Sequence, residues 1–207
     1  MSVTWIIIGV TCLVSFFAFN DRTLMNRLIL WPPAVQRDGQ YWRLLTHGLI
    51  HQDGMHLLLN MLTLYFFGPA IERVLGALAG PWAYPTFYIA ALVVSILPWQ
   101  HANRHRSDTA SLGASGAVSG VLFAYILFDP WATLLLFFVV PAPAIVLAIA
   151  YVAYSIYMDR QNTDKINHSA HLWGAAFGVA FILVVEPNVF GHFLERLAHP
   201  RFNPMGV

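Results

Sequence analysis

Side chains that can donate hydrogen bonds or carry protons gather near the start of one apolar stretch of the sequence. They are His47, His51, His56 and Asn60. If the apolar stretch is a helix, His56 and Asn60 are four residues apart and share one face. Taken alone, this pair is explained by a hydrogen bond between two membrane helices. As part of a larger site, the same two groups could donate hydrogen bonds to an oxyanion.

Another histidine, His171, opens a second apolar stretch. Gly174 and Gly178 follow it by three and seven residues, so all three lie on one stripe of a helix. Small residues at this spacing let the backbone of a neighbouring helix approach closely. Close helix packing therefore explains the two glycines but leaves the histidine unexplained.

A run of small residues places a serine where a third apolar stretch begins. Ser115 follows Gly113 and precedes Gly116, so it lies at or near a helix N-terminus. The stretch from Leu112 to Phe128 would be about 25 Å long as a helix, which is short for a bilayer. We therefore expect the helix to begin below the membrane surface, beside a water-filled cavity. Its free N–H groups would favour an oxyanion, although helix packing alone also explains the small residues.

Together, these side chains are the parts that acyl transfer requires. Ser115 could act as the nucleophile and His171 as its general base. His56 and Asn60 could donate hydrogen bonds to the oxyanion. The nearest acidic residues lie at the far ends of their apolar stretches, so none is placed to orient the histidine. The sequence therefore predicts a serine–histidine dyad.

The elements that position these residues must be membrane helices, because the composition excludes a water-soluble fold. The chain has 207 residues, of which 58% are hydrophobic and only 10% are charged, whereas soluble domains have about 25% charged residues. This composition excludes a soluble enzyme, a disordered chain, a coiled coil and a disulfide scaffold. The formal net charge of +1 argues against a nucleic-acid partner. The single cysteine, Cys12, is expected to be a buried, inert thiol.

Six apolar stretches are long enough to cross the hydrocarbon layer, which takes about 20 residues. They are Val3–Phe19, Gly54–Ile71, Trp82–Trp99, Leu112–Phe128, Trp131–Tyr157 and Ser169–Val185. We therefore predict an all-α polytopic membrane protein with a single six-span domain over residues 1–207, ending in a short polar tail. Pro141 and Pro143 should kink or break the fifth helix, because proline removes a backbone donor.

The longest connection, 20–53, is not a plain solvent loop. Its segment 22–31 mixes arginine with leucine and tryptophan, which suits an element lying in the membrane interface. A loop packed on its own protein explains this pattern equally well. The loops after the first, third and fifth spans carry most of the basic residues, and this bias alone places the first loop in the cytoplasm.

Taken in order, the motifs resemble those of the rhomboid family of intramembrane serine proteases. Trp42 and Arg43 match the family's first-loop pair. His51, His56 and Asn60 fit its histidine-x4-histidine-x3-asparagine pattern in the second span. The motifs that open the fourth and sixth spans are matched by Gly113, Ser115, Gly116, Ala170, His171, Gly174 and Gly178. The resemblance covers essentially the whole chain.

The resemblance implies a rhomboid-like bundle of six transmembrane helices with a membrane-dipped first loop, gated by the fifth span. It implies a serine endopeptidase in which Ser115 and His171 cleave transmembrane segments of substrate proteins. The oxyanion would be bound by His56, Asn60 and the Ser115 backbone N–H, with His51 as an auxiliary residue. No metal or other cofactor is expected. The partners are the bilayer and the substrates, and the expected location is the bacterial cytoplasmic membrane.

Two features depart from the family pattern. Many members carry an aromatic residue four positions after the serine, stacked against the histidine, whereas this chain has Ser119 there. We therefore expect another ring to orient His171, or a histidine that is held less firmly. Bacterial members place the first loop outside the cytoplasm, opposite to the basic-residue bias. We follow the family, because several loop arginines lie on the semi-immersed element.

The sequence leaves two other functions open. A catalytically inactive rhomboid-like scaffold would bind membrane proteins without cleaving them, but such relatives typically lack the serine or the histidine that this chain keeps. A histidine-ligated haem or metal protein would use some of the nine histidines. That function gives no reason for the serine–glycine run, and the HExxH pattern does not occur.

Overall fold

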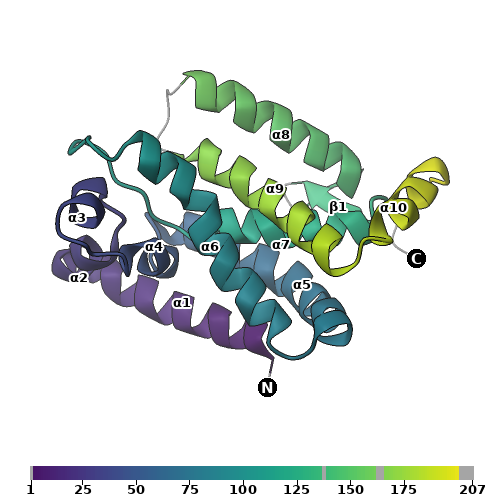
Figure 1. Ribbon diagram of the computed structural model, residues 1–207, viewed down its shortest axis with the longest axis horizontal. Helices are drawn as coiled ribbons and strands as arrows, with labels where there is room; N and C mark the ends of the chain where they lie inside the picture. The colour runs from purple at the N-terminus through teal and green to yellow at the C-terminus, as the bar shows by residue number, and fades with distance from the viewer. Residues whose placement is uncertain (1, 137–138, 162–165, 201–207) are drawn as a thin grey trace.

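The computed structural model describes residues 2–136, 139–161 and 166–200, which form a bundle of helices with one β-hairpin (Figure 1). The helices are α1 (Val3–Asn20), α2 (Arg22–Leu28), α3 (Pro32–Gln36), α4 (Arg43–Thr46), the 3-10 turn η1 (His47–Leu49), α5 (Gly54–Ala79), α6 (Ala83–Ala102), α7 (Ser115–Phe128), α8 (Ala144–Gln161), α9 (His168–Val185) and α10 (Val189–Ala198). The hairpin strands, β1 (Thr133–Leu136) and β2 (Val140–Pro143), pair antiparallel.

The short helix α7 lies at the centre of the bundle, where it packs against α5, α6 and, over the longest contact, α9. Glycines of α7 and α9 face each other along this contact. A methyl group on Gly174 would overlap the carbonyl of Gly116, and one on Gly178 would overlap the carbonyl of Gly120. The two backbones therefore touch without intervening side chains, as the glycine spacing predicts.

A carboxylate from α5 fixes the N-terminus of α1. Glu72 accepts hydrogen bonds from the Ser2 hydroxyl at 2.6 Å and the Val3 backbone N–H at 2.7 Å. It also accepts from the backbone N–H and the hydroxyl of Thr4, at 2.9 and 2.6 Å. A helix N-terminus leaves such N–H groups unsatisfied and carries a partial positive charge. Glu72 therefore accepts hydrogen bonds from these N–H groups and places a negative charge near the positive end of α1. It also links α1 to α5, the helix that carries His56 and Asn60.

The first loop folds into the short helices α2, α3 and α4 and is held by one buried arginine. The Arg43 guanidinium donates to the backbone carbonyls of Asn26, at 2.8 Å, and Ile29, and to the side chain of Gln40 at 2.7 Å. Trp42, the other member of the pair, is half exposed. Beside it, an open pocket of about 470 Å³ is lined by Leu24, Arg27, Leu28 and Trp42.

The prediction of one helix over 131–157 was wrong in its first half, where the expected break at the prolines is instead a pair of strands. The chain instead forms the hairpin β1–β2, and α8 begins only at Ala144. Pro141 and Pro143 explain the difference, because neither has a backbone N–H to donate and the proline ring clashes with the preceding helical turn. A two-stranded sheet has only edge strands, where proline is tolerated. The fold is therefore mostly helical rather than all-α.

Other boundaries also differ from the predicted ones; α5, for example, continues to Ala79 and does not end at Ile71. The fourth apolar helix begins at Ser115, three residues later than expected from the apolar stretch alone. The chain after Glu186 continues as the helix α10, whereas we predicted only a polar tail. Apolar residues recur on one face of α10, with Val189 buried against the bundle. This pattern is that of an amphipathic helix that packs on the protein.

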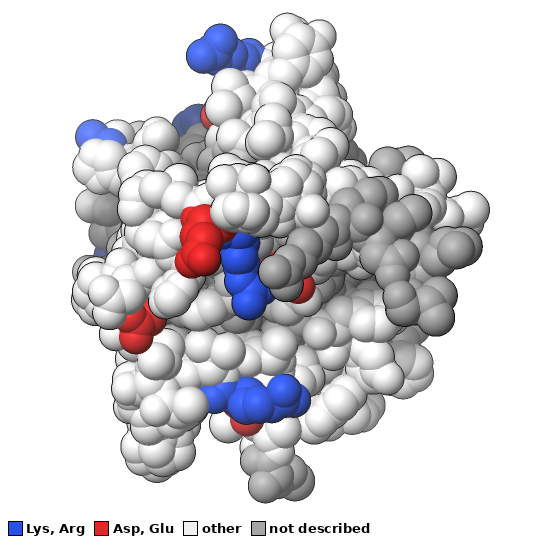
Figure 2. Space-filling model, turned by 90° about the vertical axis from the view of Figure 1, so that its right-hand side faces the viewer, with Lys and Arg blue, Asp and Glu red and all other residues white. Residues whose placement is uncertain are grey.

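The apolar surface of the bundle is typical of a membrane protein. Three described helices, α1, α5 and α9, are long and apolar enough to cross a bilayer, and α7 is a shorter apolar helix. Large apolar side chains point outward from these helices, including Phe16, Phe66 and Val184, which is 81% exposed. Figure 2 shows the end of the molecule near α10, where most of the described surface is uncharged and its charged side chains form a few small groups.

Candidate active site

Ser115 and His171 come together where α7 and α9 begin. His171 Nε2 lies 2.7 Å from Ser115 Oγ, although the residues are 56 positions apart in the chain. Ser115 is the first residue of α7, and His171 lies in the first turn of α9. The contact between Gly116 and Gly174 lies directly beside this pair and sets the distance between the two helices. A serine hydroxyl bonded to an imidazole nitrogen has the geometry in which a serine can act as a nucleophile and a histidine as its base.

The turn before Ser115 requires a glycine. Gly113 has φ +110°, a conformation that other residues rarely adopt. A Cβ atom at this position would also lie 2.7 Å from Cε1 of His56. The Gly113 N–H donates to the carbonyl of His47 at 2.9 Å. The turn is thus fixed by its own backbone conformation, by the His56 ring and by the first loop.

His51 supports the same turn from behind. Its Nε2 accepts a hydrogen bond from the Ala114 N–H at 3.4 Å, and its Nδ1 lies 3.0 Å from the Ser15 hydroxyl. Because that hydroxyl already donates to the Leu49 carbonyl, it accepts from Nδ1, so the ring is neutral with its proton on Nδ1. His51 is fully buried outside the membrane-spanning helices, and burial, reinforced by His56, lowers its pKa to about 3.

His56 and Asn60 lie on one face of α5, as their spacing predicts. Asp53 caps this helix by accepting the backbone N–H of His56 at 2.8 Å. Asn60 is buried, and its Nδ2 donates to the His56 carbonyl at 2.9 Å. An amide nitrogen has two N–H groups, so this bond uses only one of them. The His56 ring packs edge-on against His51, with 4.9 Å between ring centroids.

The ring that stacks on His171 comes from α8. Tyr151 and His171 are nearly parallel, with an interplanar angle of 17° and 6.0 Å between ring centroids. The Tyr151 hydroxyl lies 2.8 Å from Oγ of Ser119, so the small residue of α7 leaves room for the tyrosine and bonds to it. Sequence reasoning missed Tyr151, because no motif connects one of eight tyrosines to a histidine on another helix. The small Ser119 was the available signal.

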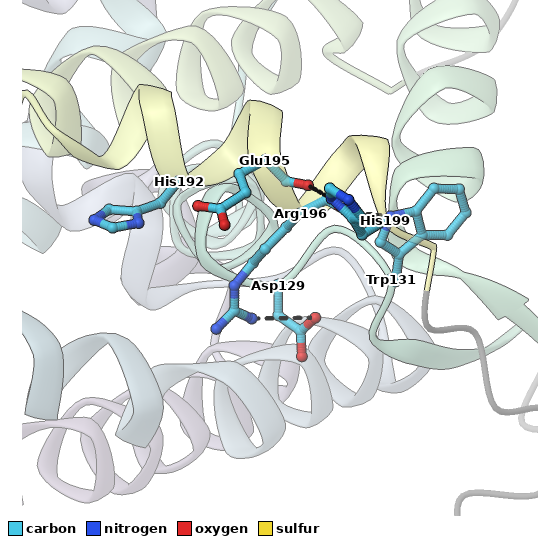
Figure 3. A pocket seen from close by; sticks show the side chains of 6 residues that line it. All are labelled: Asp129, Trp131, His192, Glu195, Arg196 and His199. Atoms are coloured by element: carbon cyan, nitrogen blue, oxygen red, sulfur yellow. Dashed lines mark hydrogen bonds and ion pairs between the residues drawn. The ribbon is translucent and has the colours of Figure 1, made fainter.

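A separate pocket of about 530 Å³ lies at the other end of α7 (Figure 3). It is lined by Asp129, Trp131, His192, Glu195, Arg196 and His199. Arg196 of α10 lies 3.8 Å from the Asp129 carboxylate, and Trp131 donates to the Arg196 carbonyl at 2.9 Å. Since α7 is about 21 Å long, this pocket is remote from Ser115. Within the described ranges, no three His, Cys, Asp or Glu side chains are grouped to hold a metal ion.

Comparison with known proteins matches this chain to one family, both by a family model and by individual relatives. A family model described as the Rhomboid domain matches residues 38–188. RHOMBOID-like protein 12, mitochondrial, of Arabidopsis thaliana is 34% identical over 174 residues, which is 79% of this chain and 52% of that protein. Rhomboid protein 1, mitochondrial, of Saccharomyces cerevisiae is 36% identical over 132 residues, 63% of this chain and 38% of the yeast protein. The chain thus spans about half or less of these two relatives.

A bacterial relative is matched over more of its length. The Bacillus subtilis rhomboid protein YdcA is 27% identical over 159 residues, which is 74% of each chain.

Proposed function

Because this chain belongs to the rhomboid family, we propose that it is an intramembrane serine endopeptidase that cleaves transmembrane segments of other proteins. The observation that carries the proposal is the 2.7 Å hydrogen bond between His171 Nε2 and Ser115 Oγ. Two residues far apart in the sequence meet there in the arrangement that nucleophilic catalysis needs.

The first half of the reaction forms an acyl-enzyme. His171 removes the hydroxyl proton of Ser115 as Oγ attacks the carbonyl carbon of the scissile peptide bond. The carbonyl oxygen becomes an oxyanion in the tetrahedral intermediate. When the intermediate collapses, the C–N bond breaks and His171 gives its proton to the leaving amine. In the second half, His171 removes a proton from a water molecule as the water oxygen attacks the acyl carbon. The bond between that carbon and Ser115 Oγ then breaks, and His171 gives the proton to Oγ.

The oxyanion is held by groups at the start of α7 and α5. The Ser115 backbone N–H belongs to a helix N-terminus, where no intrahelical partner competes for it and the helix dipole favours negative charge. His56, which packs against Gly113, and Asn60 add side-chain donors from the next helix. Fixed donors of this kind stabilise the transition state without reorganisation.

We infer that the substrate is a transmembrane segment, because the dyad lies at the start of a spanning helix that is shorter than the bilayer is thick. The 14 residues of α7 span about 21 Å, so its N-terminus lies below the membrane surface when its other end is near the opposite side. We propose that α1, α5, α6, α7, α8 and α9 are the six spans. A helical substrate hides its carbonyls in hydrogen bonds, so residues that weaken a helix should favour cleavage.

The proposed membrane and orientation follow the bacterial members of the family. The first loop, with α2 and its apolar surface beside Trp42, lies in the interface on the side away from the cytoplasm. Reporter fusions at the N-terminus test this orientation. Fractionation tests the bacterial cytoplasmic membrane against a mitochondrial membrane, because the relatives include both bacterial and mitochondrial proteins.

The experiment that tests the activity is cleavage of a fluorogenic transmembrane-segment substrate by the purified chain in liposomes. Ser115→Ala and His171→Ala should be folded and inactive. Ser107→Ala and His105→Ala are matched controls, since both residues are exposed in the loop before α7. Cleavage by Ser115→Ala at the wild-type rate would refute the assignment. A wild-type chain that binds the substrate but never cleaves it would be the inactive scaffold.

A further inference from the structure

The imidazole of His171 contacts one ring of α8 and one ring of its own helix, α9. Tyr151 of α8 stacks on it, with 6.0 Å between centroids. One helical turn further, Tyr154 of α8 meets His168 edge-on at 5.6 Å, and His168 in turn meets His171 edge-on at 5.8 Å. Both the tyrosines and the histidines are three residues apart, so each pair lies on one helix face. Two rings of α8 therefore lie against two rings at the start of α9.

The fully buried part of the α8 interface is made of small residues, beside which Ile145 packs against the cluster around Ile126. The buried residues of α8 are Ala144, Ala148 and Ser155. Large side chains such as Ile149 and Tyr157 point outward and are more than half exposed. In Figure 1, α8 lies at the outer edge of the bundle, whereas α7 and α9 lie within it. The large α8 side chain that reaches inward to the base is Tyr151, and its hydroxyl is anchored on Ser119 of the central helix at 2.8 Å.

We propose that Tyr151 is the positioning residue for the general base, so that His171 is correctly oriented only while α8 is docked. The inference rests on the proposed function. A parallel ring at this distance restricts rotation of the imidazole about its side-chain bonds and keeps Nε2 directed at Ser115 Oγ. The bond from Tyr151 to Ser119 fixes the ring itself. A displacement of α8 would carry the ring away from His171 and lower the rate of the chemical step.

The test separates stacking from simple space filling. Tyr151→Phe keeps the ring and loses the bond to Ser119, whereas Tyr151→Leu keeps apolar bulk without a ring. We expect kcat in liposomes to fall about 10-fold for Tyr151→Leu, the upper range for one aromatic contact, and about 2-fold for Tyr151→Phe, with KM unchanged in both. Tyr157→Ala is the control on the exposed face of α8 and should leave kcat unchanged.

A second variant moves the ring to the central helix. Ser119→Phe combined with Tyr151→Ala places an aromatic ring on α7 in the space that the tyrosine vacates. We expect this double variant to recover most of the kcat that Tyr151→Ala loses. Thermal unfolding shows whether the double variant folds. If it does not, the two single variants still decide the question. Equal kcat values for Tyr151→Leu and Tyr151→Phe would overturn the inference.

Labelling with a fluorophosphonate keeps this inference separate from the proposed function. A wild-type chain that is neither labelled at Ser115 nor active refutes the proposed protease. A chain that is labelled and active, but whose kcat does not depend on the ring at position 151, refutes the positioning role alone.

Discussion

The distance between α7 and α9 should be the most sensitive dimension of the site, and Gly174→Ala tests it. An alanine Cβ at this position would lie 2.7 Å from the carbonyl carbon of Gly116 and 3.0 Å from its Cα, besides overlapping the carbonyl oxygen. Carbon atoms in contact normally lie about 3.5–4.0 Å apart. These are backbone atoms of a central helix, so they cannot rotate away. The two helices must therefore separate by about 1 Å at this level.

That separation acts directly on the dyad. Ser115 precedes Gly116, and His171 lies one turn before Gly174, so the bond of 2.7 Å between them would lengthen to about 3.7 Å. This exceeds hydrogen-bond reach, and a misplacement of 1 Å can cost about 100-fold in rate. Overpacking of this kind also costs about 1–3 kcal/mol of stability.

The assay is kcat in liposomes together with thermal unfolding of the same preparation. Gly76→Ala is the matched control, because a Cβ on Gly76 in α5 meets no atom within 4 Å. The control should keep the wild-type rate and be as stable or slightly more so, since alanine favours a helix. A Gly174→Ala variant with wild-type kcat and wild-type thermal stability would refute the reasoning about close packing.

Three further predictions concern the framework around the dyad. Gly113→Ala should lower both kcat and the unfolding temperature, because φ +110° is strained for alanine by about 1–3 kcal/mol and its Cβ meets the His56 ring. Glu72→Ala should lower the unfolding temperature by removing the acceptor of four hydrogen bonds, while the folded fraction keeps its kcat. Stability should also fall as the pH drops below about 6.5, since burial lowers the pKa of His47 to about 4 and that of His51 to about 3. The unfolded chain then binds more protons than the folded one, so unfolding measured at pH 7 and pH 5 should differ by roughly 2 kcal/mol per histidine.

Much of the site could be predicted because its residues belong to local patterns. Ser115 sits in a run of small residues that only a tight turn and a close helix contact would need, and His171 shares a stripe with its glycines. Spacing along one helix fixes which side chains share a face. Membership of the rhomboid family then follows from motif order, and the family match covers residues 38–188.

What could not be predicted depends on contacts between distant segments. Hydropathy alone made the stretch around Pro141 and Pro143 look like part of a helix, although their missing donors favour the hairpin that forms. The role of Tyr151 depends on how α8 is rotated about its axis relative to α9. The sequence of α8 alone does not predict this rotation. The helix α10 was missed because a helix of ten residues is too short to be stable alone and gains its stability only against the bundle.

The central claim is that the imidazole on α9 activates one hydroxyl at the start of α7. Mass mapping of the purified chain after treatment with a fluorophosphonate tests this claim most directly. We predict a single adduct on Ser115 in the wild type and its loss in His171→Ala, with the fold of that variant unchanged. An adduct on Ser115 that forms equally fast without His171, or an adduct elsewhere while Ser115 stays unmodified, would contradict the account.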